Sequence, residues 1–147
     1  MSIHATDVIR IVPPVFPISE LQLGDRTYSV PSQDWVADVF SRYHWGARTP
    51  YAAERFDCED LALEAVVLAR KLHAQSTTEL HGLACGWLYY TPTKQTLGVQ
   101  YGNQDHALTW FITGTKGNET ILFFEPQRSY TVPLEPEELQ SVYGANM

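Results

Sequence analysis

The stretch RFDCEDLALEAVVLARKL, from Arg55 to Leu72, decides the fold because it is the clearest helical segment of the chain. Small and apolar residues recur in it at spacings of three and four, which places them on one helix face. They are Cys58, Leu61, Ala62, Ala65, Leu68, Ala69 and Leu72. Asp57 predicts the N-cap, and Asp60, three residues on, predicts a capping box. We therefore expect a helix that begins at Cys58 and buries one face.

Helices are expected before this point and strands after it. Ser32, following Pro31, predicts the start of a helix that runs to about Trp45. After Ala74 the chain turns to short aromatic or β-branched segments separated by Gly, Asn, Lys and Pro, which predict strands: GLACGWLYY, TLGVQY, HALTWFIT, TILFFE and SYTV. PEELQSVY predicts a short closing helix. Residues 1–31 are expected to be irregular, with a short strand at VIRIV. The fold class is α+β, N-terminal helices packed on an antiparallel sheet.

Length and composition restrict the classes of function. The 147 residues predict a single domain over 1–147, and 44% hydrophobic with 18% charged residues is a globular composition. A net charge of −7 with scattered basic residues argues against nucleic acid as a partner. Two cysteines are too few for a disulfide framework. We see no signal peptide and no membrane-spanning segment, so the expectation is a cytoplasmic protein without a membrane partner. The sequence does not indicate an oligomeric state.

Two strands bring polar side chains together. His106–Thr113 and Thr120–Gln127 flank the loop GTKGNE, whose glycines and asparagine predict a hairpin. If the hairpin is symmetric, Thr113 pairs with Thr120, and His106 lies diagonal to Glu125 on the same face. A slip of one residue would put the two on opposite faces. The sequence therefore predicts a histidine–carboxylate pair that depends on this register.

Cys58 is the candidate nucleophile beside this pair. Backbone N–H groups and the positive dipole end at a helix start stabilise a thiolate, although the acids around Cys58 oppose that effect. A carboxylate on one nitrogen of His106 would leave the other nitrogen as a base. Gln127 is a neutral donor that could hold the pair or a ligand oxygen.

Simpler interpretations of the same residues stay open. Cys58 could be a small core residue, and His106 a histidine satisfied at a strand end. Glu125 and Gln127 could end a strand at the surface. The acids at 57, 59 and 60 could be solvated capping residues. Cys85, in the middle of a strand, is predicted to fill the core. Most aromatic residues of the sheet are predicted to do the same, and some could instead line a substrate groove.

DCEDLALEA, DHALTWFI and ILFFEPQ resemble motifs of the papain-like and transglutaminase-like superfamily of cysteine hydrolases. They are most similar to the papain-like C-terminal domain of mushroom agglutinins, a calcium-dependent cysteine protease domain fused to a lectin. The resemblance covers about Phe56 to Gln127. It implies a papain-like core, with the roles of nucleophile for Cys58, general base for His106, orienting carboxylate for Glu125 and auxiliary residue for Gln127. It also implies candidate Ca²⁺ contacts at Glu59 and Asp60.

The expected function is therefore a cysteine hydrolase, a thiol peptidase or amidase that acts on a peptide or protein substrate through a Cys58–His106–Glu125 triad and a thioester acyl-enzyme. Attack by an amine instead of water would make it a transamidase. A binding or assembly protein on the same scaffold, without catalysis, is the alternative from another class. A third is a calcium-responsive module in which the acids at 57 to 60 hold a structural metal.

Overall fold

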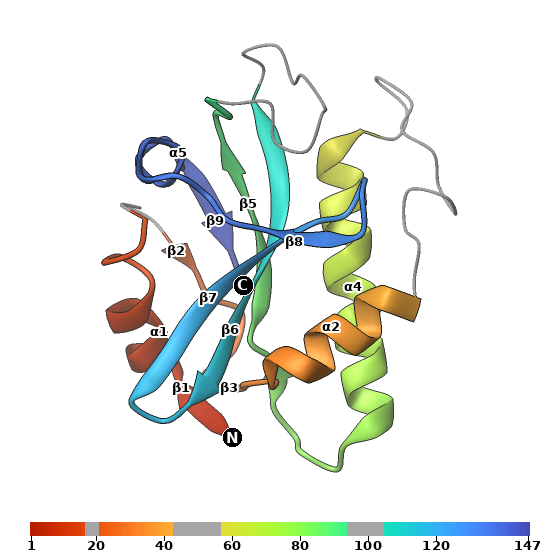
Figure 1. Ribbon diagram of the computed structural model, residues 1–147. Helices are drawn as coiled ribbons and strands as arrows, with labels where there is room; N and C mark the ends of the chain where they lie inside the picture. Colours follow the sequence, from red (N-terminus) through yellow and green to blue (C-terminus); the bar gives the residue numbers. More distant parts are fainter. Residues whose placement is uncertain (17–20, 43–56, 94–104) are drawn as a thin grey trace.

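The structure, a computed structural model, describes residues 1–16, 21–42, 57–93 and 105–147 (Figure 1). Its strands are β1 (Ser2–His4), β2 (Leu21–Gln22), β3 (Thr27–Ser29), β4 (Gly82–Leu83), β5 (Cys85–Tyr90), β6 (His106–Thr115), β7 (Asn118–Glu125), β8 (Tyr130–Val132) and β9 (Gly144–Asn146). Its helices are α1 (Ala5–Ile11), α2 (Gln33–Arg42), α4 (Cys58–Ser76) and α5 (Pro136–Gln140). The α+β class predicted from the sequence is confirmed.

Two sheets organise the described residues. The larger has six strands in the order β2-β9-β5-β6-β7-β8, and the smaller has three in the order β1-β3-β4. The strands β5 to β8 pair antiparallel with their neighbours, as predicted, whereas β2 with β9 and β3 with β4 are parallel. The segment GLACGWLYY, predicted as one strand, is split between the two sheets: Ala84 donates to Ser29 O at 2.8 Å and accepts from Ile112 N at 3.0 Å. Ala84 therefore joins the sheets.

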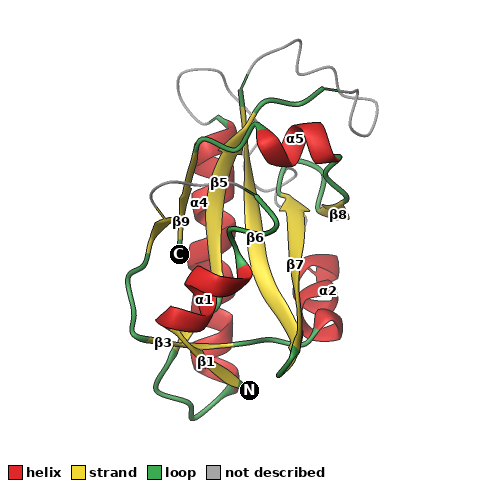
Figure 2. Cartoon of the chain, turned by 90° about the vertical axis from the view of Figure 1, so that its left-hand side faces the viewer, coloured by secondary structure: helices red, strands yellow, loops and turns green. Residues whose placement is uncertain are grey.

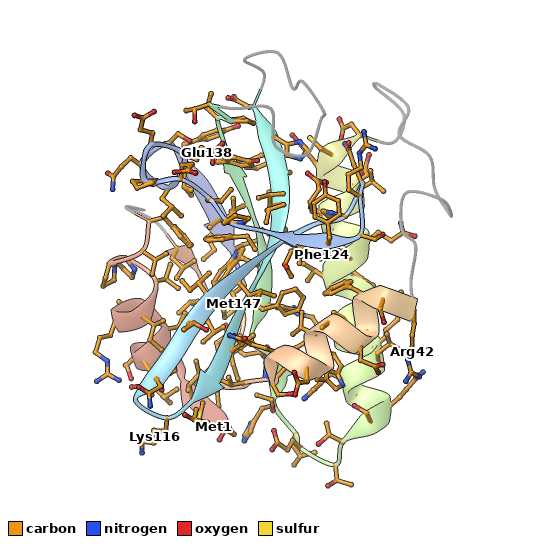
Figure 3. All side chains as sticks on the ribbon, in the orientation of Figure 1. Met1, Arg42, Lys116, Phe124, Glu138 and Met147 are labelled. Atoms are coloured by element: carbon orange, nitrogen blue, oxygen red, sulfur yellow. The ribbon has the colours of Figure 1, made fainter. Side chains whose placement is uncertain are left out.

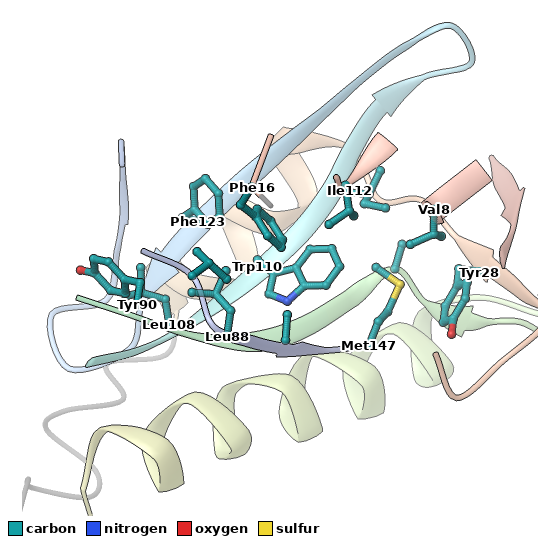
Figure 4. Close-up of a cluster of buried hydrophobic side chains, with 14 of the residues drawn as sticks. Val8, Phe16, Tyr28, Leu88, Tyr90, Leu108, Trp110, Ile112, Phe123 and Met147 are labelled. Carbon is teal, nitrogen blue, oxygen red and sulfur yellow. The ribbon is translucent and has the colours of Figure 1, made fainter. Parts of the chain in front are cut away.

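Helices lie on both faces of the larger sheet. The helices α2 and α4 lie on one face and α1 on the other (Figures 1 and 2). On the α1 face, Trp110 is fully buried and meets Phe16 edge-on at 5.8 Å between ring centroids (Figure 4). Phe16 belongs to the segment PPVFP, so the extended path that its prolines impose delivers an aromatic ring to the core.

The face covered by α2 and α4 holds a second apolar cluster. Phe124 of β7 lies on the side of the sheet that α2 and α4 cover (Figure 3). Phe40 of α2 stacks on it with ring centroids 3.6 Å apart. Ala62, Ala65 and Ala69 of α4 are fully buried, and these small side chains let the helix approach the sheet closely. The strand β6 is thus covered on both faces, which explains why its residues from His106 to Thr113 are all buried.

The long helix begins where the sequence predicts. Asp57 accepts a hydrogen bond from Glu59 N at 3.0 Å, and Asp60 accepts one from Asp57 N at 3.3 Å, which completes the capping box. The predicted first helix is confirmed as α2, which begins at Gln33 after the cap of Ser32. Its predicted continuation from 43 to about Trp45 lies outside the described residues, as does the predicted strand TLGVQY.

The predicted hairpin register is confirmed. Thr113 pairs with Thr120, and Thr109 pairs with Phe124 at the far end of the ladder. Gly114 and Gly117 have φ angles of 109° and 87°, which favour glycine and allow the tight turn between the strands. Because this register holds, His106 and Glu125 share a face.

The N-terminal segment differs from the prediction. The sequence predicts that residues 1–31 are irregular, with a strand at VIRIV. In the structure the residues of VIRIV lie in α1 and directly after it. The reason is a capping box: His4 Nδ1 accepts from Thr6 N, and Asp7 accepts from His4 N at 3.1 Å. Val8 and Val12 then share the buried side at helical spacing, and both are fully buried.

Among the described helices, none is long and apolar enough to cross a membrane.

The stacked ring of Phe40 is expected to carry much of the contact between α2 and the sheet. Phe40→Ala should lower the free energy of unfolding by about 3 to 5 kcal/mol, because a buried aromatic ring is removed and a cavity remains. Urea unfolding followed by circular dichroism measures this change. Leu80→Ala is the matched control: Leu80 is 98% exposed, so its removal should change the free energy by less than about 0.5 kcal/mol. Equal effects of the two substitutions would contradict the packing role.

Candidate functional site

A buried histidine–carboxylate pair lies where β6 begins and β7 ends. His106 is the first residue of β6 and Glu125 the last of β7, and each side chain is 2% exposed. His106 Nε2 contacts Glu125 Oε2 in a buried hydrogen bond. A buried carboxylate and a buried imidazole are costly unless paired, so this contact is what allows both to stay in the interior.

The turn after β7 holds the second oxygen of the same carboxylate. Gln127 N donates to Glu125 Oε1 at 2.9 Å, and Ser129 N donates to Glu125 O at 2.9 Å. Ser129 adopts a φ of 59°, in the left-handed region, where the chain reverses toward β8. Gln127 therefore contributes through its backbone N–H, which fixes the orientation of the carboxylate. The role of its side chain stays a prediction.

Cys58 completes the cluster from the start of α4. Its side chain is partly exposed and shares a hydrogen bond with His106. Thr109 Oγ1, three residues into β6, donates to Ala62 O of α4 at 3.0 Å and ties the helix to the strand. The structure thus brings together Cys58, His106 and Glu125, and it adds a contact from the backbone N–H of Gln127 that the sequence did not predict.

The environment of His106 stabilises its positive charge. Burial would lower the pKa of His106, but hydrogen bonds with Cys58 and Glu125 and the negative charges of these two groups raise it to about 9. An imidazolium that is bound to a carboxylate on one nitrogen and faces a sulfur atom favours negative charge on that sulfur. Chemically, the cluster can present a nucleophilic sulfur to a ligand and hold a proton beside it.

The two cysteines occupy opposite environments. Cys85 is fully buried in β5, and burial raises the pKa of its thiol to about 11 although Arg70 lies beside it. Arg70 Nη2 donates to the Cys85 carbonyl at 3.1 Å. The prediction that Cys85 fills the core is confirmed, and Cys58 is the thiol that a ligand can reach.

The acids beside Cys58 are engaged locally. Asp57 and Asp60 close the capping box, and Glu59 accepts a hydrogen bond from the phenol of Tyr89. In the part of the chain that the structure describes, no group of three His, Cys, Asp or Glu side chains is arranged to hold a metal ion. The Ca²⁺ contacts expected at Glu59 and Asp60 stay a prediction.

Two stacked tyrosines, which we call the aromatic wall, border the cluster. The sequence left open that some aromatic residues line a groove but did not identify this pair. Tyr89 of β5 stacks on Tyr143 with centroids 5.5 Å apart, and Tyr143 donates to Asp105 Oδ2 at 3.1 Å. Burial, then a hydrogen bond with Asp105, raises the pKa of Tyr143 to about 12. Burial, and to a smaller extent a hydrogen bond with Glu59, raises the pKa of Tyr89 as well. The alternation in CGWLYY, which puts Trp87 and Tyr89 on one face, was the only signal in the sequence. Tyr143 comes from a distant part of the chain, so no local pattern indicates its contact with Tyr89.

Comparisons with known proteins find the fold in solved structures. No protein-family model matches the chain, and no curated protein matches it. One solved structure is PSL1a in complex with E64, with a TM-score of 0.73 and 21% identity over 99% of this chain and 51% of that chain. Another is a Polyporus squamosus lectin bound to the human-type influenza-binding epitope Neu5Acα2-6Galβ1-4GlcNAc, with a TM-score of 0.75 and 22% identity over 99% of this chain and 49% of that chain. This chain spans about half the length of these proteins. At such identities the likeness shows the fold alone.

These neighbours correct the functional expectations from the sequence. The resemblance to papain-like and transglutaminase-like hydrolases gives way to a likeness to PSL1a and to a Polyporus squamosus lectin. The expected thiol peptidase or amidase, with its peptide substrate and its transamidase alternative, is overturned by the same finding, since one neighbour is a lectin with a bound glycan. The physical reason is that a hydrogen-bonded thiol, imidazole and carboxylate do not by themselves require turnover, because neither fold nor residue order fixes an activity.

The raised pKa of His106 predicts a pH-dependent stability. Because the folded-state pKa of about 9 exceeds the ordinary 6.5, the pair stabilises the fold fully below about pH 6.5, and this contribution is lost as the pH rises through 9. The loss should be on the order of 2 kcal/mol in the free energy of unfolding, measured by urea titration between pH 6.5 and 9.5.

Glu125→Gln should flatten this pH dependence, because it removes the charge that holds the proton on the ring. Asp34→Asn, at an exposed position of α2, is the control and should keep the wild-type profile. Parallel profiles for wild type and Glu125→Gln would contradict the coupling.

Proposed function

We propose that the chain is a ligand-binding module whose site is the Cys58–His106–Glu125 cluster. The observation that carries this proposal is a partly exposed sulfur hydrogen-bonded to a buried, positively charged ring. The packing of the core does not require a thiol beside a histidine–carboxylate pair. Cys85 is fully buried in the sheet among apolar side chains, so a cysteine of this chain can fill the core without such a pair. The cluster instead suits a ligand that reaches the sulfur from outside.

The sulfur binds its ligand through a covalent bond. The thiolate of Cys58 donates an electron pair to an electrophilic carbon of the ligand, and the bond between that carbon and an electronegative neighbouring atom breaks. The imidazolium of His106 gives its proton to the atom released from that bond. Glu125 keeps the ring oriented throughout. A protein that shares this fold over about half of its chain, PSL1a, forms a complex with E64, and E64 therefore supplies a probe for the proposed site.

The finer prediction of fold belongs to the same proposal. A papain-like or transglutaminase-like core needs a helix with cysteine at its start, packed on an antiparallel sheet that carries histidine and a carboxylate. The placement of Cys58 on α4 and of His106 and Glu125 on β6 and β7 supports it. This proposal concerns architecture and carries no claim of turnover.

Carbohydrate binding is a second candidate, favoured by the glycan bound to the Polyporus squamosus lectin. The neighbour chain is about twice as long as this one, so the glycan of the whole protein comes to this chain only as a proposal. We place it away from Cys58, because the carboxylates of Glu59 and Asp105 beside that residue would repel a sialic acid.

Covalent capture of E64 tests the first candidate. Incubation should add one E64 to the wild-type chain and none to Cys58→Ser, measured by intact mass. His106→Ala should slow the adduct roughly tenfold or more, since the charge that favours the thiolate is gone. His81→Ala, at an exposed residue, is the control. An adduct on Cys85, or equal rates in wild type and His106→Ala, would sink the proposal.

The same reaction, run with Ca²⁺ and with a chelator, addresses the calcium contacts. A rate that depends on Ca²⁺ and loses this dependence in Asp60→Asn would support Glu59 and Asp60 as contacts. A rate indifferent to Ca²⁺ in both proteins would count against them.

Calorimetry with Neu5Acα2-6Galβ1-4GlcNAc, the epitope of the neighbour, tests the second candidate. We expect binding by the wild-type chain that persists in Cys58→Ser, because the glycan site lies apart from the sulfur. The trisaccharide's Galβ1-4GlcNAc portion alone is the control for the contribution of sialic acid. Absence of binding to both sugars would remove this candidate and leave the first untouched.

A further inference from the structure

An exposed aromatic surface lies beside Cys58 without a packing reason for its exposure. Tyr143 is 57% exposed and lies nearly parallel to Tyr89, at an interplanar angle of 11°. Trp87 meets Tyr89 edge-on at 4.8 Å between ring centroids. Rings held by their neighbours in this way offer a rigid face to a ligand at little entropic cost.

Two exposed carboxylates flank these rings. Asp105 accepts from Tyr143 at Oδ2 and from Thr91 Oγ1 at Oδ1, at 3.1 and 3.0 Å. Glu59 accepts from the phenol of Tyr89. Both acids are thereby fixed in place while they remain in contact with solvent.

The chain itself places this surface at the cluster. Glu59 directly follows Cys58, and Asp105 directly precedes His106. Tyr89 pairs with Ala107 in the β5–β6 ladder, one rung from His106. The two carboxylates therefore lie next in the chain to Cys58 and His106, and the phenol of Tyr143 joins Asp105 to the ring of Tyr89.

No basic side chain neutralises these acids within the described ranges. The ion pairs formed there by arginine are Arg10 with Asp7 and Arg42 with Asp38, both on other helices. The opposing positive charge is the imidazolium of His106, which is buried and bound to Glu125. The exposed side of the site is thus negative and the buried side positive.

We infer that Tyr89, Tyr143, Glu59 and Asp105 form a subsite that selects ligands carrying an ammonium or guanidinium group next to the atom that bonds to Cys58. This inference rests on the proposed function of the cluster and names its ligand class. A cation over an aromatic face is attracted by the ring, and two carboxylates at its edge add to that attraction. An anionic ligand is repelled by the same charges.

Methanethiosulfonate reagents of opposite charge test the subsite at Cys58 itself. The thiolate attacks the sulfenyl sulfur, a mixed disulfide forms, and methanesulfinate leaves with the electron pair. The rate with the trimethylammonium-ethyl reagent is divided by the rate with the sulfonato-ethyl reagent, and this ratio is normalised to that of free 2-mercaptoethanol. We expect a normalised ratio of about ten at low salt that falls toward one at high salt, as screening requires.

Matched neutral variants identify the source of the preference. Glu59→Gln and Asp105→Asn each keep an oxygen acceptor for the tyrosine and should each lower the ratio about threefold. Asp34→Asn removes the same charge at the start of α2, where the neighbouring Gln33 contacts Thr120 at the far end of the hairpin from His106, and should leave the ratio unchanged. A wild-type ratio near one, or equal ratios in all four proteins, would overturn the inference.

The uncharged methyl reagent distinguishes a failure of the subsite from a failure of the proposed function of the cluster. If Cys58 reacts quickly with it, and His106→Ala slows that reaction, but the charged reagents show no preference, the subsite fails and the cluster stands. If the methyl reagent reacts no faster in wild type than in His106→Ala, the proposed function fails, and the subsite with it.

Discussion

The buried contact between His106 and Glu125 is the constraint on which the rest of the site depends. Two ionisable side chains, each 2% exposed, stay in the interior only as a pair, and removing one partner of such a pair costs about 3 to 5 kcal/mol. The pair in turn needs one register of β6 and β7, because a slip of one residue would turn the two side chains to opposite faces. The turn at Gln127 and Ser129 then supplies the N–H groups that hold the end of β7.

The start of α4 explains how a thiol can lie among acids and still face a positive group. From the sequence, Asp57, Glu59 and Asp60 oppose negative charge on Cys58. In the structure Asp57 and Asp60 bind each other's backbone N–H groups or those of the first turn, and Glu59 binds Tyr89. The charges are thus directed to the cap and to the aromatic wall, while the sulfur faces the ring of His106.

Local patterns were sufficient to predict the parts that local chemistry controls. The start of α4 and the register of the β6–β7 hairpin follow from a capping box and from glycines in a turn, and both are confirmed. The helix α1 was missed because its cap is His4, an uncommon N-cap whose ring nitrogen replaces the usual hydroxyl or carboxylate. The aromatic wall was missed for a different reason. It exists because β9 pairs with β5 and brings Tyr143 to Tyr89, and no spacing within either segment contains that contact.

The cluster also shows that the presence of a site and its chemical activity are separate questions, although one sequence pattern suggests an answer to both. A cysteine, a histidine and a carboxylate in this order predicted a site, and the three side chains do meet. The same order predicts hydrolysis, which the likeness to a lectin with a bound glycan overturns. What the geometry itself determines is narrower: a partly exposed sulfur, a buried imidazole bound to a carboxylate, and exposed carboxylates at the neighbouring tyrosines. Those charges act within a few ångströms of the ligand, where screening is weakest, so they, more than the net charge of −7, set which ligands approach the sulfur. We therefore infer that Glu59, Asp105 and the two tyrosines select the ligand, whereas Cys58 and His106 form the bond to it.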